Sequence, residues 1–294
     1  TEELIKEAGA LASINNPDVS MLQTNLDLLV DAINSEADLR EVVLPMVSHS
    51  LAQSLRNRLE VEQWVRDYPE IRNEVMELGQ SVISAIPRAT AVLLTGDLEA
   101  ADYLIQADDE IDARAIQVEE KCFQELALQS PVAGDLRELV SMIKIAGELE
   151  RSADLAVNIC KAARRIYGHK IDPELSDLIA KMSEQAQQLF ISTMEAFRDH
   201  DAAKAAAIDD MDSFLDGLHR RFIAEIFEIH ARESIDLQVA VQLAMVARFY
   251  ERIGDHAVNV GERTRFIVTG WKPELKGAAR FQARLDATGE IPRP

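Results

Sequence analysis

Acidic residues recur in pairs four positions apart at four places in this 294-residue chain. Both side chains of such a pair lie on one face of a helix, because residues four apart are one turn apart. The pairs are Asp108 with Asp112, Glu150 with Asp154, Asp212 with Asp216, and Glu251 with Asp255. Carboxylate oxygens are the ligands that hard cations such as Mg²⁺, Ca²⁺, Mn²⁺ and iron prefer. The spacing therefore indicates metal sites if pairs from neighbouring helices face each other.

Solvated acidic faces are the alternative interpretation of the same pairs. The chain holds 51 Asp and Glu residues, so such pairs arise often, and Arg151 and Arg252 directly follow Glu150 and Glu251. Four carboxylates within about 5 Å repel by roughly 3 kcal/mol per pair at an effective dielectric constant of 20. A gathered cluster therefore needs protons, arginine or a cation. Spacing alone leaves both interpretations open.

Two histidines lie near these pairs, but motifs for catalysis are lacking. His256 follows Asp255, and His219 is three residues after Asp216, so each can add a nitrogen ligand. The first half of the chain has Leu155 where the second has His256, which argues that nitrogen is not required. No G-x-S-x-G, H-E-x-x-H, E-x-x-H or glycine-rich phosphate loop occurs. The residues therefore offer few alternatives for catalysis.

The acidic pairs belong to an internal duplication. Residues 135–166 align with 236–267 without a gap, with 12 identities in 32 positions. Upstream, the segment that begins at Gly96 aligns with the segment that begins at His200. The acidic pair at 108 and 112 therefore corresponds to the pair at 212 and 216. A repeat of about 100 residues therefore occurs twice and carries the carboxylates at matched places.

Composition and periodicity predict helices as the elements that position these residues. The chain has 12 Gly and 9 Pro, and aromatic residues make up 5%, which favours an all-α protein. A seam of apolar and small residues with alternating spacings of three and four predicts a bundle of long helices. Asp97 and Asp201 are expected N-caps, and Pro87 is expected to kink the first helix without ending it. The predicted helices span 74–95, 97–129, 131–167, 173–199, 201–231 and 233–269.

The duplication also predicts the domain organisation. We expect a helical extension, two three-helix repeats and a C-terminal tail, at residues 1–71, 72–168, 169–270 and 271–294.

Charge and cysteine content limit the partners and the compartment. The formal net charge of -20 disfavours nucleic acid as a partner. Cys122 and Cys160 sit among apolar neighbours, which predicts reduced core thiols in a reducing compartment. No stretch has the roughly 20 apolar residues that a membrane span needs, and the start does not resemble a signal peptide. A soluble protein is expected.

Three motifs carry a resemblance to a known family. They are E-R-S-A-D-L-A-V-N-I at 150–159, E-R-I-G-D-H-A-V-N-V at 251–260 and P-V-A-G-D-L-R at 131–137. Together with the acidic pairs they closely resemble the PhoU family of phosphate-signalling regulators, over about residues 72–270. The resemblance implies two pseudo-symmetric three-helix bundles with divalent or ferric metal ions (iron, magnesium, manganese or zinc) on their surface. The ligands that it implies are Asp108, Asp112, Glu150, Asp154, Asp212, Asp216, Glu251 and Asp255.

The resemblance also implies a role and a set of partners. It implies a non-enzymatic, cytoplasmic, usually dimeric adaptor, which reaches the inner face of the membrane through protein partners. These partners are the ATPase subunit of the phosphate ABC transporter and a membrane sensor histidine kinase, and the adaptor represses phosphate uptake and the phosphate-starvation response. Two other interpretations are a carboxylate-bridged di-metal, ferritin-like enzyme and a purely structural coiled-coil scaffold.

The N-terminal extension has a resemblance of its own. Residues 57–71 weakly resemble the leading helices of a bacterial sulfotransferase family. The nucleotide-phosphate loop of those enzymes should follow, but residues 72–75 run into the first repeat instead. Sulfotransferase activity is therefore not predicted.

Overall fold

The computed structural model describes residues 68–131, 133–232 and 235–271, and all regular structure in these ranges is α-helical. This confirms the all-α prediction for the described part of the chain. The expected N-terminal extension and the tail lie almost entirely outside the described residues, and the exact domain boundaries stay predictions. The helices are α5 (Pro69–Thr95), α6 (Leu98–Gln129), α7 (Ala133–Arg165), α8 (Pro173–Asp199), α9 (Ala202–Arg232) and α10 (Leu237–Thr269).

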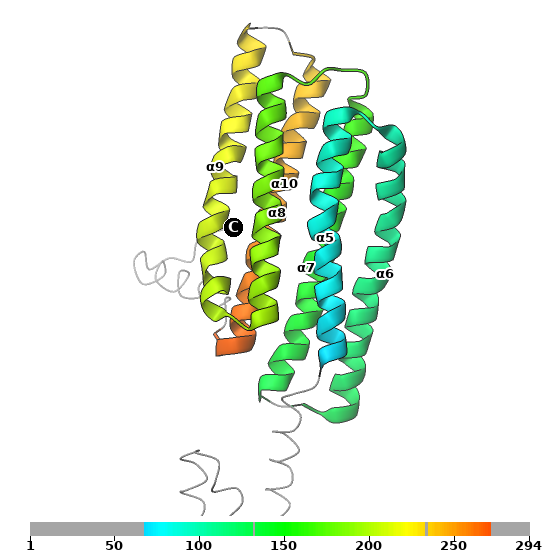
Figure 1. The fold of residues 1–294 in the computed structure, drawn as a ribbon, viewed down its shortest axis with the longest axis vertical. Helices are drawn as coiled ribbons and strands as arrows, with labels where there is room; N and C mark the ends of the chain where they lie inside the picture. The colour runs from blue at the N-terminus through cyan, green and yellow to red at the C-terminus, as the bar shows by residue number, and fades with distance from the viewer. Residues whose placement is uncertain (1–67, 132, 233–234, 272–294) are drawn as a thin grey trace, which may run out of the picture. The chain divides into compact units, whose positions relative to one another are not determined.

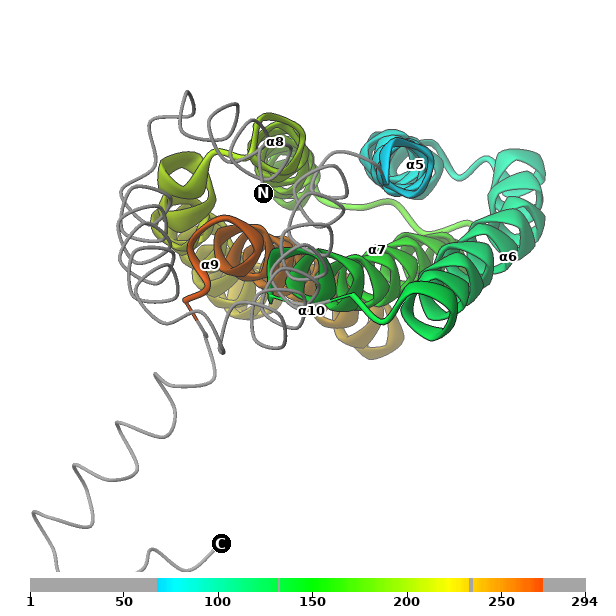
Figure 2. The same cartoon turned by 90° about the horizontal axis from the view of Figure 1, so that it is seen from below.

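The two repeats pack against each other through their third helices. Helix α7 of the first repeat lies along α10 of the second, with α6 against α7 and α9 against α10. Helices α5 and α8 pack on each other and cover α7 and α10 (Figures 1 and 2). The helices that carry the two E-R-x-x-D motifs are therefore central, and each meets the helix that carries the other acidic pair of its repeat.

The helix ends follow local sequence signals closely. Asp97 Oδ1 accepts a hydrogen bond from Ala100 N at 2.9 Å, and Asp201 Oδ1 accepts one from Ala203 N at 2.9 Å. Both predicted N-caps are thus confirmed. Helix α5 runs through Pro87 to Thr95, and it begins at Pro69 rather than at 74, because proline suits the first turn of a helix.

The predicted seam forms the core. Its members on α7 are all buried, and those on α10 are buried except the half-buried Ala240. They are Leu139, Met142, Ala146, Leu149, Ala153, Ala156 and Cys160 on α7, and Ala240, Leu243, Ala247, Tyr250, Gly254, Ala257 and Gly261 on α10. Cys122 and Cys160 are free and buried, and burial is the main cause that raises their pKa to about 12 and about 11. Both thiols therefore stay protonated at neutral pH. In the described part of the chain, no helix combines the length and the apolar character that crossing a bilayer requires.

A buried polar contact joins the two repeats across the core. Thr90 Oγ1 on α5 lies 2.7 Å from Ser183 Oγ on α8 and 2.7 Å from Tyr250 Oη on α10. Tyr250 is fully buried, so its hydroxyl depends on this contact. The contact therefore sets the position of α5 along α8 and α10.

The substitution Tyr250→Phe tests the weight of this contact. We expect the free energy of unfolding to fall by about 1 kcal/mol, since one buried hydrogen bond is lost and a small void is left. Urea titration followed by circular dichroism measures the change. The matched control Tyr167→Phe removes an exposed hydroxyl and should change stability by less than about 0.5 kcal/mol. Equal effects of the two substitutions would contradict the role assigned to Tyr250.

Candidate functional site

Four carboxylates gather where α6 meets α7 in the first repeat. Helix α6 supplies Asp108 and Asp112, and α7 supplies Glu150 and Asp154. Asp108 is 9% exposed, Asp112 and Glu150 are half-buried, and Asp154 is exposed. The solvent exposure of the four side chains thus increases from Asp108, inside the helix interface, to Asp154, at the surface.

Electrostatics shows that these groups act on one another. The pKa of Asp108 is raised to about 6, first by burial and then by the charges of Asp112 and Asp154. Burial and the Asp154 charge also raise the pKa of Asp112 and of Glu150. A pKa rises in this way when the ionised form is disfavoured. At neutral pH the carboxylates of the cluster therefore carry negative charge, although burial and the neighbouring carboxylates disfavour their ionised forms.

Two oxygens of the first-repeat cluster have no partner in the described part of the chain. Asp108 Oδ1 and Asp112 Oδ1 are both buried, and neither receives a hydrogen bond. A buried acceptor without a donor is costly and uncommon in folded proteins. A proton or a bound cation would satisfy both atoms, and the all-oxygen donor set suits a hard metal ion.

The second repeat places its carboxylates differently. The pKa of Asp212 is also raised to about 6, by burial first and then by Asp216 and Asp255. Glu251, in contrast, forms an ion pair with Arg248. Asp212 therefore interacts with Asp216 and Asp255, while the Glu251 carboxylate is paired with the Arg248 guanidinium.

A glycine lets Asp212 approach α10 closely. A Cβ atom at position 254 would collide with Asp212 Oδ1 and would lie 2.8 Å from Leu215 Cδ2. Because Gly254 has no side chain, the Asp212 carboxylate can rest against the backbone of α10. Ala153 holds the matched place in the first repeat, so the two clusters are not identical.

The predicted ligands do not converge into a coordination sphere. Within the ranges that the structure describes, no three Asp, Glu, His or Cys side chains lie close enough together to hold a metal ion as they stand. Asp154, Asp216 and Asp255 are exposed, so the carboxylates of each cluster are only partly enclosed. The metal assignment stays a prediction, supported by the gathered charge and the unpartnered oxygens.

His256 serves an inter-helix contact that the sequence did not reveal. Its Nδ1 lies 2.6 Å from Glu148 Oε2 on α7, and the same oxygen accepts a hydrogen bond from Asn259 Nδ2 at 3.0 Å. Arg151 adds an ion pair to Glu148 at 3.1 Å. Phe249 stands at the matched place of the second repeat, so comparison of the repeats could not single out Glu148.

The other candidate nitrogen ligand, His219, lies half-buried on α9. Burial and then the Arg248 charge lower the pKa of His219, although Asp216 acts in the opposite direction. Its neutral form is therefore favoured, which is the form that binds metals.

Replacement of Glu148 by alanine should weaken the junction between the repeats. Burial alone would raise the pKa of Glu148, but the hydrogen bonds from His256 and Asn259 outweigh it and lower the pKa. The stabilisation is therefore complete above pH 4.5 and is lost as the pH falls through the lowered value. We expect Glu148→Ala to reduce the free energy of unfolding by about 2 kcal/mol at pH 7, and by less at pH 4.

Urea titrations at the two pH values measure this difference. Glu195→Ala is the control, since Glu195 forms an exposed ion pair with Lys204 at 3.4 Å. Its removal should change stability by no more than about 0.5 kcal/mol. A Glu148→Ala variant as stable as the control variant at pH 7 would show that the junction contributes nothing.

Comparisons with known proteins match both repeats. The model of the PhoU domain matches residues 75–163 and 179–264. A phosphate-specific transport system accessory protein of Mycobacterium tuberculosis, PhoU homolog 1, is 40% identical over 190 residues, which cover 64% of this chain and 85% of that protein. The crystal structure of the phosphate transport system regulatory protein PhoU from Streptococcus pneumoniae superposes with a TM-score of 0.64 at 26% identity, over 73% of this chain and 97% of that one. PhoU from Pseudomonas aeruginosa superposes with a TM-score of 0.65 at 25% identity, over 69% of this chain and 97% of that one.

Fold and site together define a duplicated three-helix-bundle protein with carboxylate pairs at matched places. The chain belongs to the PhoU family, as the family model and the relatives show. Proteins of this family are regulatory accessory proteins rather than enzymes, which confirms the prediction of a non-enzymatic role. None of these matches supports the sulfotransferase resemblance of residues 57–71, which lies mostly outside the described residues.

Proposed function

We propose that this protein is a regulatory accessory protein of phosphate transport, which represses phosphate uptake and the starvation response when phosphate is plentiful. The observation that carries this proposal is the 40% identity to a phosphate-specific transport system accessory protein over 85% of its length. The family model matches both repeats, so the agreement with these proteins extends over the whole bundle.

The proposed partners are the ATPase subunit of the phosphate ABC transporter and a membrane sensor histidine kinase. The protein acts in the cytoplasm at the inner membrane face, as a homodimer. Large apolar side chains stand exposed on the two outer helices, at Phe123 on α6 and at Phe214 and Phe227 on α9. Aromatic residues are enriched at the surfaces where proteins bind one another, which supports docking through these helices.

Metal binding is the second part of the proposal. The residues of the first repeat fit a hard cation, because they offer only oxygen donors and two of these are buried without partners. Iron, manganese, magnesium or zinc, when bound, neutralises the carboxylates of Asp108, Asp112, Glu150 and Asp154 and so holds α6 to α7. In the second repeat the same role falls to Asp212, Asp216 and Asp255, with Glu251 in competition with its Arg248 pair.

Affinity capture tests the proposed partners directly. The tagged full chain is incubated with purified transporter ATPase and with the solubilised sensor kinase, each at millimolar and at micromolar phosphate. We expect both to be retained, with more ATPase retained at high phosphate, where uptake is repressed. Retention no greater than on an untagged resin, for both partners and at both concentrations, would contradict the adaptor role.

A further inference from the structure

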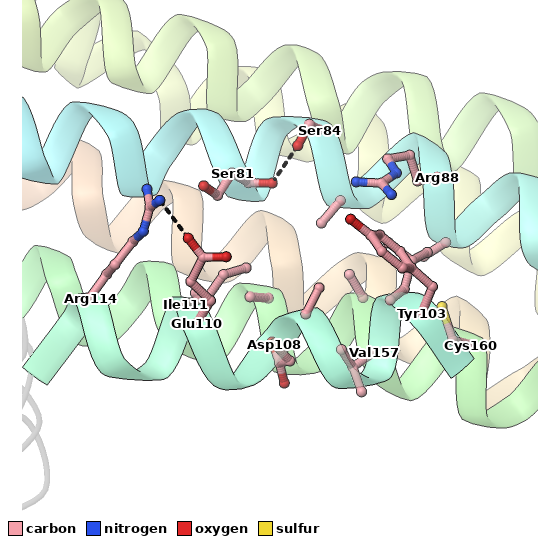
Figure 3. A pocket seen from close by; sticks show the side chains of 16 residues that line it. Ser81, Ser84, Arg88, Tyr103, Asp108, Glu110, Ile111, Arg114, Val157 and Cys160 are labelled. Atoms are coloured by element: carbon pink, nitrogen blue, oxygen red, sulfur yellow. Dashed lines mark hydrogen bonds and ion pairs between the residues drawn. The ribbon is translucent and has the colours of Figure 1, made fainter. Parts of the chain in front are cut away.

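A hollow of about 270 Å³ opens between α5 and α6, with α7 as its floor. Its walls carry both polar and apolar side chains, and the floor is formed by Ala153, Ala156, Val157 and Cys160. Figure 3 shows Arg88 and Tyr103 side by side at one end and Arg114, bonded to Glu110, at the other. We call this hollow the α5–α6 groove.

Arg88 is the cation in the α5–α6 groove that is available to a ligand. Its guanidinium lies over the Tyr103 ring, 5.5 Å from the centroid. In the described ranges no carboxylate lies within ion-pair distance of Arg88, whereas Arg114 is paired with Glu110 at 2.6 Å. An unpaired guanidinium beside a cavity, in a chain of net charge -20, can bind an anion through charge-assisted hydrogen bonds.

The Asp108 side chain lines the groove, but its carboxylate does not face an anion bound at Arg88. Figure 3 shows its carboxylate directed away from the α5 wall that carries Ser81, Ser84 and Arg88. The serine hydroxyls donate to backbone oxygens within α5, so each keeps lone pairs that can accept from a ligand hydroxyl. The groove thus offers a cation at one end and acceptors along one wall.

The two arginines and the tyrosine of the groove occur in the first repeat alone. At the matched places of the second repeat Ser192 replaces Arg88, Ala207 replaces Tyr103 and Leu218 replaces Arg114. The repeat therefore folds without these three side chains. The acidic residues, in contrast, occur in both repeats. This difference separates Arg88, Tyr103 and Arg114 from the acidic residues that both repeats share, and it points to a role other than folding.

We propose that the α5–α6 groove binds a small phosphomonoester, with the phosphoryl group on Arg88 and the Tyr103 hydroxyl and the organic part over the alanine floor. The choice of a phosphoryl group over other anions rests on the proposed function in phosphate regulation. The volume favours an ester over inorganic phosphate, since 270 Å³ is close to the lower end of the roughly 300–1,000 Å³ that small-molecule pockets span. A second hollow of about 340 Å³ adjoins the groove and also includes Arg88 and Tyr103, so a longer ligand can extend past them.

Isothermal titration calorimetry with the full chain tests the proposal with three probes: AMP, inorganic phosphate and adenosine. We expect AMP to bind at least about tenfold more tightly than phosphate, because only AMP also covers the alanine floor, and adenosine to bind at least about tenfold more weakly than AMP. Arg88→Gln should weaken AMP binding about tenfold or more at an unchanged melting temperature. Arg165→Gln is the matched control, since it removes one exposed positive charge at the end of α7 and should leave the affinity unchanged.

Each outcome decides between the possibilities. If phosphate bound as tightly as AMP and this binding were lost in Arg88→Gln, the site would bind a phosphoryl group, but its ligand would be inorganic phosphate and the proposed ester would be wrong. Failure of both AMP and phosphate to bind at millimolar concentration, equal binding of adenosine, or an Arg88→Gln variant that binds normally would overturn the proposal. These titrations contain no transporter and no kinase, so their failure leaves the affinity-capture result untouched, and a failed capture leaves the titrations interpretable.

Discussion

The double substitution Asp108→Asn with Asp212→Asn should stabilise the metal-free protein at pH 7.5, although it removes two charged side chains. Both carboxyls have a folded-state pKa of about 6 against 3.8 for the free group, mainly because of burial. A pKa raised by about two corresponds to at most about 3 kcal/mol for each group, and we expect about 1 kcal/mol for each, because the other carboxylates of each cluster are partly in contact with water. We therefore expect the free energy of unfolding to rise by about 2 kcal/mol in the presence of a chelator.

The pH dependence of this gain follows from the direction of the pKa shift. A carboxyl whose pKa is raised on folding costs no stability below pH 3.8, where it is protonated in both states, and its full cost appears above about pH 6. The advantage of the double variant should therefore be small at pH 4.5 and complete at pH 7. Urea titrations measure it, with Asp210→Asn as a control for the loss of an exposed carboxylate on α9. A double variant less stable than the wild type at pH 7, with chelator, would refute this account of the clusters.

Gly254→Val should be the most damaging single substitution considered for the second repeat. A branched side chain there must displace both the Asp212 carboxylate and Leu215, which lies 2.8 Å from the position of the added Cβ. Overpacking of a tight helix contact costs about 1–3 kcal/mol, and we expect a loss near the upper end because two neighbours must move.

Gly147→Val is the matched control for this substitution. Gly147 also lies within a long helix, α7, but a Cβ there meets nothing within 4 Å. Its replacement should change stability by less than about 1 kcal/mol. Chemical denaturation of the two variants side by side gives the comparison. If Gly254→Val unfolded at the same urea concentration as Gly147→Val, the close approach of α9 to α10 would not constrain the second cluster.

The sequence predicted the helices well because their signals are local. Asp97 and Asp201 cap helices through their own backbone neighbours, and the apolar seam of α7 and α10 needs only the helical period. The duplication, in turn, showed that helices of the same kind recur. These features involve residues close in the chain, so a single sequence carries them.

The sequence could not predict the sorting of the carboxylates within each cluster. Spacing placed Asp108 and Asp112 on one helix face, but the register of α6 against α7 decides that Asp108 is buried and Asp154 exposed. In the same way, the Glu251 ion pair with Arg248 depends on side-chain conformation. The predicted equivalence of the two sets is therefore only approximate.

The contacts that distinguish the two repeats were also hidden in the sequence. Glu148 is 108 residues away from His256, and nothing in the local pattern links them. Comparison of the repeats draws attention to shared residues, whereas Glu148 and Arg88 occur in the first repeat only. Such contacts arise from the packing of the repeats, and only the folded chain reveals them.

Thermal unfolding of the chelator-treated full chain during a Mn²⁺ titration tests the central claim, that a cation makes the gathered carboxylates tolerable. A ligand at 100 times its dissociation constant stabilises a protein by about 2.7 kcal/mol, which corresponds to a rise of roughly 5–10 °C for a domain of this size. We predict such a rise for the wild type and none for Asp108→Asn with Asp212→Asn. Melting curves of the wild type that superimpose from zero to millimolar Mn²⁺ would contradict the claim.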